Sequence, residues 1–171
     1  MPESPPDRIL ALLTVPNQPS LTQALGRLAI AHTHLELILR YCVKTIADQT
    51  IEQALDATEG DRISDVRVRV KQLFKERQPT ALEKTNLDAL FGRAKHLSEK
   101  RNSYLHRAWS ETAAGRAIMK GGDHQWGSAP SEEEILHAAE EITNLVAEIN
   151  EARLHGFIKD VVLRHKASLV P

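Results

Sequence analysis

The sequence predicts an all-α protein: an up-and-down bundle of four main helices, with short helical pieces and a small hairpin or irregular insert before the last helix. Three observations support this fold class. Apolar residues recur at alternating steps of three and four over several long stretches, which is typical of helices packed on one side. A Ser or Thr followed three residues later by Glu or Gln, the capping-box pattern, begins three of these stretches. Pro and Gly separate them.

The composition indicates one domain with an aliphatic core. The chain has 171 residues, of which 42% are hydrophobic and only 4% aromatic. This length suffices to bury a core, and the core must consist mainly of Leu, Ile, Val and Ala. The formal net charge of −1 provides no overall basic field. Any binding of nucleic acid must therefore rest on a local patch.

Cysteine usage and hydropathy predict a cytoplasmic protein. The single cysteine, Cys42, excludes an intramolecular disulfide and fits a reducing compartment. No apolar run approaches the ~20 residues of a membrane span. The first residues lack the basic start and small-residue cleavage site of a signal peptide. We therefore expect no membrane association.

Prolines mark the boundary of the domain. Five of the eight prolines lie in residues 1–19, and proline both fixes φ and removes a hydrogen-bond donor. We expect residues 1–19 to form an arm, residues 20–165 to form a single helical domain, and residues 166–171 to form a tail.

The first helix is expected to begin with a capping box at Ser20, directly after Pro19. Its apolar stripe continues to Ile46, and His32 lies on that stripe with Glu36 one turn later. A histidine in such a position is more often a hydrogen-bonded core residue than a group that contacts a ligand. Both interpretations remain open from the sequence.

Two shorter elements should follow. Residues 50–57 read as a short helical extension that ends at a Glu-Gly-Asp sequence. Residues 63–77 fit either a helix or an alternating strand; length, a possible cap at Asp61 or Ser64, and the cations near the end favour a helix. With Arg62, six Lys and Arg residues make this the basic helix, and we expect a solvated charged face.

The next helix should begin with the capping box at Thr80, and its apolar stripe leads to Arg101. A charged residue in a core-facing position must be paired, or must face a cleft or an interface. Arg101 is therefore a candidate functional residue. The structural alternative is that Arg101 and His106 only complement the carbonyl groups at a helix C-terminus.

An insert and a closing helix complete the chain. Helical periodicity lapses over residues 108–130, where residues 116–120 could pair in a hairpin. Trp109 and Trp126 bracket the insert and could either fasten it to the bundle or stack on bases. A third capping box at Ser131 begins a long helix that could continue through Phe157. Residues 131–151 carry seven glutamates and no Lys or Arg, so that face should point away from a nucleic-acid site or towards a basic partner.

The densest group of functional side chains lies at the end of the helix that begins near Thr80. Residues 97–109 gather Lys100, Arg101, Asn102, His106 and Arg107 within about two helical turns. Asn102 and His106 are four residues apart, so the amide is expected to orient the imidazole. A permanent cation and a titratable base would then share one helix end.

The motif resembles that of the HEPN superfamily (higher eukaryotes and prokaryotes nucleotide-binding), an Arg followed by a polar residue, three further residues and a His. Here it reads Arg101-Asn102-Ser103-Tyr104-Leu105-His106. The resemblance extends to a Leu-Glu pair on the first helix, an aromatic residue after the motif and an insert before the last helix. It implies a small helical domain, often dimeric, and for many members a metal-independent ribonuclease of toxin–antitoxin, phage-defence or RNA-processing systems. This chain departs from many relatives by placing Arg107, rather than Gly, after the His.

The chemistry of the motif fits cleavage of RNA without a metal or another cofactor. Histidine has an ordinary pKa near ~6.5, so a neutral His106 can take the proton of a ribose 2′-OH. Arg101 can hold the scissile phosphate through two donors and stabilise its developing charge. Because DNA lacks the 2′-OH, the expected substrate is RNA. Residues expected to contact the substrate are Lys100, Tyr104, Arg107, Trp109, His32 and Glu36.

One catalytic group is missing from the sequence, and two other functions stay open. No general acid for the leaving 5′-oxygen is evident, and a second copy of the motif in a homodimer could supply it. The domain could instead bind RNA or a nucleotide without cutting it. It could also be a helical module for homodimerisation or for binding a protein of the antitoxin type.

Overall fold

The computed structural model describes residues 16–112 and 114–169, and it confirms an all-α bundle with a small insert. The expected course of residues 1–15 lies outside the described residues. The six helices are α1 (Pro19–Ala47), α2 (Ile51–Asp56), α3 (Ile63–Glu76), α4 (Ala81–Leu105), α5 (Glu132–Leu154) and α6 (Phe157–Ser168). Between α4 and α5 lie three strands, β1 (Trp109–Glu111), β2 (Ala117–Lys120) and β3 (Trp126–Ser128).

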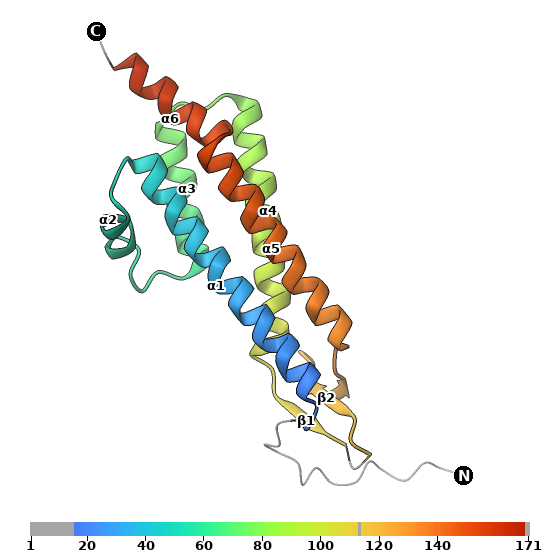
Figure 1. Cartoon of the computed structure of the whole chain (residues 1–171). Helices are drawn as coiled ribbons and strands as arrows, with labels where there is room; N and C mark the ends of the chain where they lie inside the picture. Colours follow the sequence, from blue (N-terminus) through green and yellow to red (C-terminus); the bar gives the residue numbers. More distant parts are fainter. Residues whose placement is uncertain (1–15, 113, 170–171) are drawn as a thin grey trace.

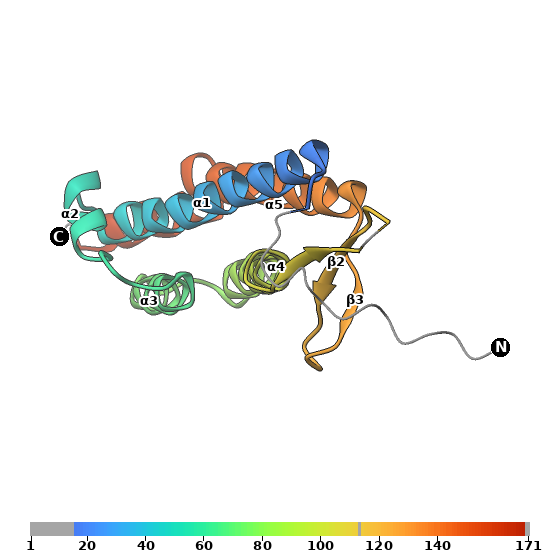
Figure 2. The same ribbon diagram turned by 90° about the horizontal axis from the view of Figure 1, so that it is seen from below.

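The long helices form two layers (Figures 1 and 2). α1 and α5 lie side by side in one layer, and the hairpin of α3 and α4 crosses them obliquely in the other. The helix directions do not simply alternate, as they would in the up-and-down arrangement expected from the sequence. Arg153 near the end of α5 donates to Thr45 near the end of α1, and Arg77 at the end of α3 donates to the carbonyl of Ile46. Thus α1, α3 and α5 run the same way, and α4 opposes them.

The segment around α2 explains why α1 and α3 are parallel. It leads the chain back along α1, so that Arg40 of α1 donates to the carbonyl groups of Thr58 and Asp61, just before α3 begins. Gly60 has a φ of 73°, a left-handed conformation that glycine adopts without steric cost, and this allows the turn. The spacing of apolar residues in the sequence does not predict that the chain returns along α1 in this way.

Four helix starts test the expected caps. Thr80 and Ser131 each form a complete capping box with the glutamate three residues later, as predicted. The box at Ser20 is wrong: the N-cap is Gln18, two residues earlier, and α1 begins at Pro19, whose missing N–H and fixed φ suit the first helical position. The expected cap of α3 at Asp61 or Ser64 is also wrong, because Arg62 occupies that position without a side-chain bond.

The last helical stretch divides into two helices instead of running through Phe157. α5 ends at Leu154, and α6 begins after Gly156. A Cβ on Gly156 would lie 3.1 Å from the Cα of Ala152, so the absence of a side chain permits this close approach. α6 extends to Ser168, past the domain boundary expected at residue 165.

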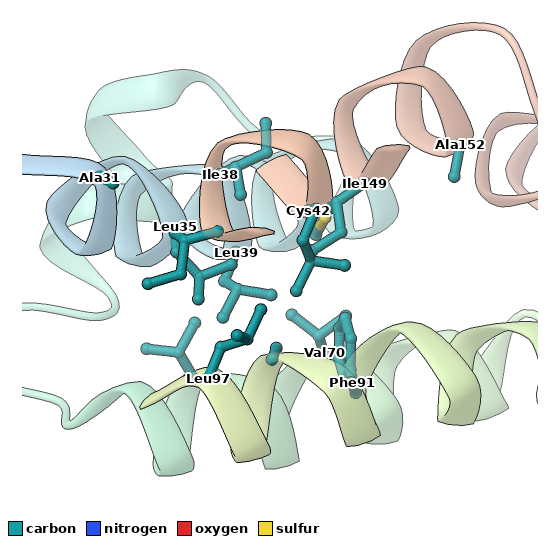
Figure 3. Close-up of a cluster of buried hydrophobic side chains, with 14 of the residues drawn as sticks. Ala31, Leu35, Ile38, Leu39, Cys42, Val70, Phe91, Leu97, Ile149 and Ala152 are labelled. Atoms are coloured by element: carbon teal, nitrogen blue, oxygen red, sulfur yellow. The ribbon is translucent and has the colours of Figure 1, made fainter. Parts of the chain in front are cut away.

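Aliphatic side chains from both layers meet between them (Figure 3). Leu35, Leu39 and Cys42 of α1 face Phe91 and Leu97 of α4, and all are buried. Burial raises the pKa of the Cys42 thiol to about 12, so Cys42 behaves as a small neutral core residue. The core thus has the aliphatic character predicted from the composition.

The insert is a three-stranded antiparallel sheet at one end of the bundle (Figure 1). The segment expected to pair as a hairpin forms β2, which pairs with β1 on one side and with β3 on the other. The backbone N–H of Asn17 and the side chain of Gln18 bond to Glu111 and Gly115, which fastens the start of α1 to the sheet. In the described part of the chain, no helix has the length and apolar character needed to cross a membrane.

The cations of the basic helix α3 mostly have partners within the chain. Arg69 pairs with Asp61 and Lys71 pairs with Asp88. Arg67 donates to the carbonyl of Phe91 on the neighbouring helix α4. The sequence predicted a solvated charged face, whereas these cations also bond to neighbouring segments of the chain.

Candidate active site at the end of α4

Arg101 occupies the core-facing line of α4 in its last turn. The preceding residues on this line, Leu87, Phe91, Ala94 and Ser98, are buried, and Arg101 itself is half-buried. Its Nε atom is buried and has no hydrogen-bond partner. Within residues 16–112 and 114–169 the guanidinium forms no ion pair with a carboxylate. A cation is therefore held on an apolar line with its charge uncompensated.

The guanidinium of Arg101 contacts both other residues of the motif. Its Nη1 donates to Asn102 Oδ1 at 2.9 Å and lies 3.0 Å from His106 Nε2. An Arg has donors only, so Nε2 must be the acceptor in this contact. A neutral imidazole that accepts this bond carries its proton on Nδ1.

The spacing predicts that Asn102 orients the imidazole of His106, but in the structure it does not. The i,i+4 relationship holds inside a helix, but His106 is the C-cap of α4, with φ −103° and ψ 1°. The His106 side chain consequently leaves the face that carries Asn102, and the Asn102 amide bonds to Arg101 instead. The role of Asn102 in this geometry is to fix the guanidinium.

A buried histidine of α1, His32, contacts the same part of α4. His32 is only 3% exposed; its Nε2 is 3.2 Å from Ser98 Oγ and its Nδ1 is 3.3 Å from Glu36 Oε1. His32 is thus a hydrogen-bonded core residue and cannot contact a substrate as the structure stands. Glu36, beside His32, is 39% exposed.

The His32 side chain is electrostatically coupled to the motif. Burial lowers the pKa of His32 to about 4, and the nearby charges of Arg101 and His106 act in the same direction. His32 is therefore neutral near pH 7. The motif and the polar residues beneath it belong to one cluster, which joins α1 to the end of α4.

Two of the residues expected to contact the substrate, Lys100 and Trp109, have side-chain partners within the chain, and Tyr104 contributes its backbone carbonyl. Lys100 pairs with Glu141 of α5 at 3.2 Å, so part of the acidic helix face is directed towards α4. Trp109 is half-buried, and its Nε1 donates to the carbonyl of Tyr104 at 2.7 Å. This tryptophan fastens the sheet to the end of α4, which was the commoner of its two expected roles.

Arg107 remains exposed, directly beside His106. Its Nη2 lies near the turn between β2 and β3: a Cβ built on Gly122 in that turn would be 3.6 Å from it. Arg107 is thus the cation of the motif that is most open to solvent.

Sequence reasoning did not single out Ser98 or Glu141. Ser98 precedes Arg101 by three residues on the same face of α4, so its small polar side chain could have been linked to the motif by spacing. Glu141 lies 41 residues after Lys100 in sequence, and only the packing of α5 on α4 brings the two together. No local pattern predicts that pair.

Neither a metal centre nor a relative adds to this geometry. In the part of the chain that the structure describes, no three His, Cys, Asp or Glu side chains are grouped so that they could hold a metal ion. No family model, curated protein or solved structure matches the chain.

Proposed function

We propose that this chain is a metal-independent RNA endonuclease of the HEPN type, with Arg101 and His106 as its reactive pair. The contact between Arg101 Nη1 and His106 Nε2 carries the proposal. It places a basic nitrogen beside a guanidinium that has no carboxylate partner among the described residues. A phosphodiester could serve as the anionic partner of this guanidinium.

The proposed reaction uses the ribose 2′-OH as the nucleophile. His106 Nε2 takes the 2′-OH proton while the 2′-oxygen attacks phosphorus, and the bond from phosphorus to the 5′-oxygen breaks. Arg101, steadied by Asn102, binds the non-bridging oxygens, whose charge increases in the transition state. The products are a 2′,3′-cyclic phosphate and a 5′-hydroxyl, which needs one proton.

The donor of that last proton is proposed to come from a second copy of the chain. His32 is buried and its lowered pKa keeps it neutral, so it is poorly suited to donate a proton to an exposed leaving group. A homodimer that brings two motifs to one cleft would supply a second His106. A toxin or phage-defence role, with an antitoxin-type protein as partner, accompanies this proposal.

One observation favours a second function, binding of RNA or a nucleotide without cleavage. In the structure the lone pair of His106 Nε2 is occupied by Arg101 Nη1. If the substrate does not displace this contact, the imidazole cannot act as a base. The pair would then serve only as a phosphate-binding group.

A comparison of three matched strands distinguishes these functions. We expect a mixed-sequence single-stranded RNA to be cut in the presence of EDTA, with 2′,3′-cyclic phosphate ends, whereas the DNA and the 2′-O-methyl RNA of the same sequence stay intact. Binding of all three strands without cleavage would establish the non-catalytic alternative. A dimer that binds none of them would indicate an interaction module.

A further inference from the structure

A pocket of about 310 Å³ lies at the other end of α1 from the start of that helix, where α1 ends beside α5 and α6. Its lining includes three cations, one from each helix: Lys44, Arg153 and Lys159. A volume near 300 Å³ falls at the lower end of the range for small-molecule sites. The proposed catalytic pair is not part of this pocket.

Neutral groups hold the Arg153 side chain in place. Its Nη1 donates to Thr45 Oγ1 at 3.2 Å and its Nη2 donates to Asn150 Oδ1 at 2.7 Å. The guanidinium carbon lies 5.5 Å from the centre of the Tyr41 ring. Each Nη nitrogen carries two protons and uses one of them in these bonds, so each keeps one donor in the guanidinium plane; the buried Nε–H also has no hydrogen-bond partner in the described chain.

The positive charge of the pocket is not neutralised by its own residues. In the described chain Lys44, Arg153 and Lys159 make no ion pair with a carboxylate. The pocket lining contains one carboxylate, Asp48, and Lys166 binds it at 2.8 Å. The Lys166 hydrogen bond and charge hold the pKa of Asp48 below its usual range, so Asp48 and Lys166 cancel each other.

Two other surface arginines of this protein are neutralised by carboxylates. Arg93 is bound by both carboxylate oxygens of Glu148, and Arg164 is bound by both of Glu83. Arg153 instead has two amide or hydroxyl partners and an aromatic ring. Its planar pair of remaining donors matches the geometry of an oxyanion.

We propose that this pocket binds the phosphate group of a small phosphomonoester. Arg153 contributes the planar donors, and Lys44 and Lys159 contribute two further positive charges. A carboxylate, with one negative charge, would leave most of this charge unbalanced, whereas a phosphomonoester carries nearly two at neutral pH. The proposal is independent of RNA cleavage at Arg101 and His106.

Calorimetric titration of the full chain tests the proposal, with inorganic phosphate and glycerol 3-phosphate as probes at constant ionic strength. The double variant K44Q/K159Q should bind both probes at least about tenfold more weakly, since each lost ammonium removes a charge-assisted hydrogen bond. The control is Lys84→Gln, which removes an exposed lysine outside the pocket and should leave binding unchanged. Arg153→Gln should abolish binding; the double variant keeps the test valid if Arg153→Gln does not fold.

Two outcomes would overturn the assignment. Equal affinity of the wild type, K44Q/K159Q and Lys84→Gln for phosphate would show that the pocket is not an anion site. A 2′-O-methyl RNA without terminal phosphates serves as the second arm, because the proposed nuclease cannot cut it. If K44Q/K159Q weakens this strand but not glycerol 3-phosphate, the pocket binds the backbone of RNA and not a small phosphomonoester.

Discussion

His106 Nε2 lies 3.0 Å from Arg101 Nη1, across the point where α4 ends. Five positions separate the two residues in sequence, and the non-helical backbone of His106 turns its ring back towards the guanidinium. The contact requires an unprotonated Nε2, because a guanidinium cannot accept a hydrogen bond. We therefore predict that neutral His106 carries its proton on Nδ1. Long-range nitrogen–proton NMR of the imidazole at pH 8 would report the tautomer, and a proton on Nε2 would contradict this geometry.

The charge of Arg101 should lower the stability of the fold. Its Nε is buried without a partner, and the helix line that leads to it is apolar except for Ser98. Arg101→Met should therefore raise the free energy of unfolding by about 1 kcal/mol, as expected when an unfavourable functional charge is replaced by an apolar side chain. Chemical denaturation would measure this. The matched control, Arg153→Met, should lower stability, because Arg153 has bonds to Thr45 and Asn150. A loss of stability in Arg101→Met would mean that Arg101 is structural.

Arg101→Lys should eliminate the proposed activity without unfolding the protein. An ammonium cannot reproduce the two planar donors of a guanidinium. It also cannot hold Asn102 and a phosphate in the same geometry. Cleavage rates of Arg101→Lys and of Lys95→Arg, a change at an exposed residue on the same helix, provide the comparison. Full activity in Arg101→Lys would remove bidentate phosphate binding from the mechanism.

The low pKa of His32 makes stability depend on pH. The pKa is about 4 in the folded chain and ordinarily near 6.5, so between these values the unfolded chain binds a proton that the folded chain does not. Stability should thus fall as the pH falls from 6.5 towards 4, by up to about 3 kcal/mol. His32→Gln cannot titrate and should lack this part of the loss. Denaturation of both proteins across that range measures the difference, and parallel curves would show that Glu36 keeps His32 protonated.

The tryptophan that fastens the sheet should contribute through its indole N–H. Trp109→Phe keeps most of the packing but leaves the carbonyl of Tyr104 without its 2.7 Å donor. We expect a loss of about 1 kcal/mol in the free energy of unfolding. Trp126→Phe serves as the control, since its indole makes no such bond in the described chain. An equal effect of the two substitutions would mean that packing alone explains the role of Trp109.

The sequence predicted the helices well because each buries an aliphatic stripe with a helical period. It predicted the starts of α4 and α5 because Thr80 and Ser131 have the complete chemistry of a capping box. At Ser20 the same pattern failed, because Pro19 already satisfies the geometry of the first helical position. The parallel course of α1 and α3 depends on how the segment around α2 folds back, and periodicity carries no information about that.

The candidate site was predicted in part. Arg101 was identified because a charge on an apolar stripe needs a reason, and the structure places it half-buried without a carboxylate partner among the described residues. The predicted contact from Asn102 to His106 is absent from the structure. The spacing rule holds only inside a helix, and α4 has already ended at His106. The coupling of His32 to Arg101 depends on how α1 and α4 cross, which only the tertiary structure shows.

The most direct test of the central claim is the rate of RNA cleavage by His106→Ala in EDTA. His137→Ala is the matched control, because His137 is 66% exposed on α5 and lies outside the motif. We predict that His106→Ala folds normally and loses activity by ~10²–10⁴, the usual contribution of a general base, while His137→Ala cuts like the wild type and leaves 2′,3′-cyclic phosphate ends. Undiminished cleavage by His106→Ala would contradict the account.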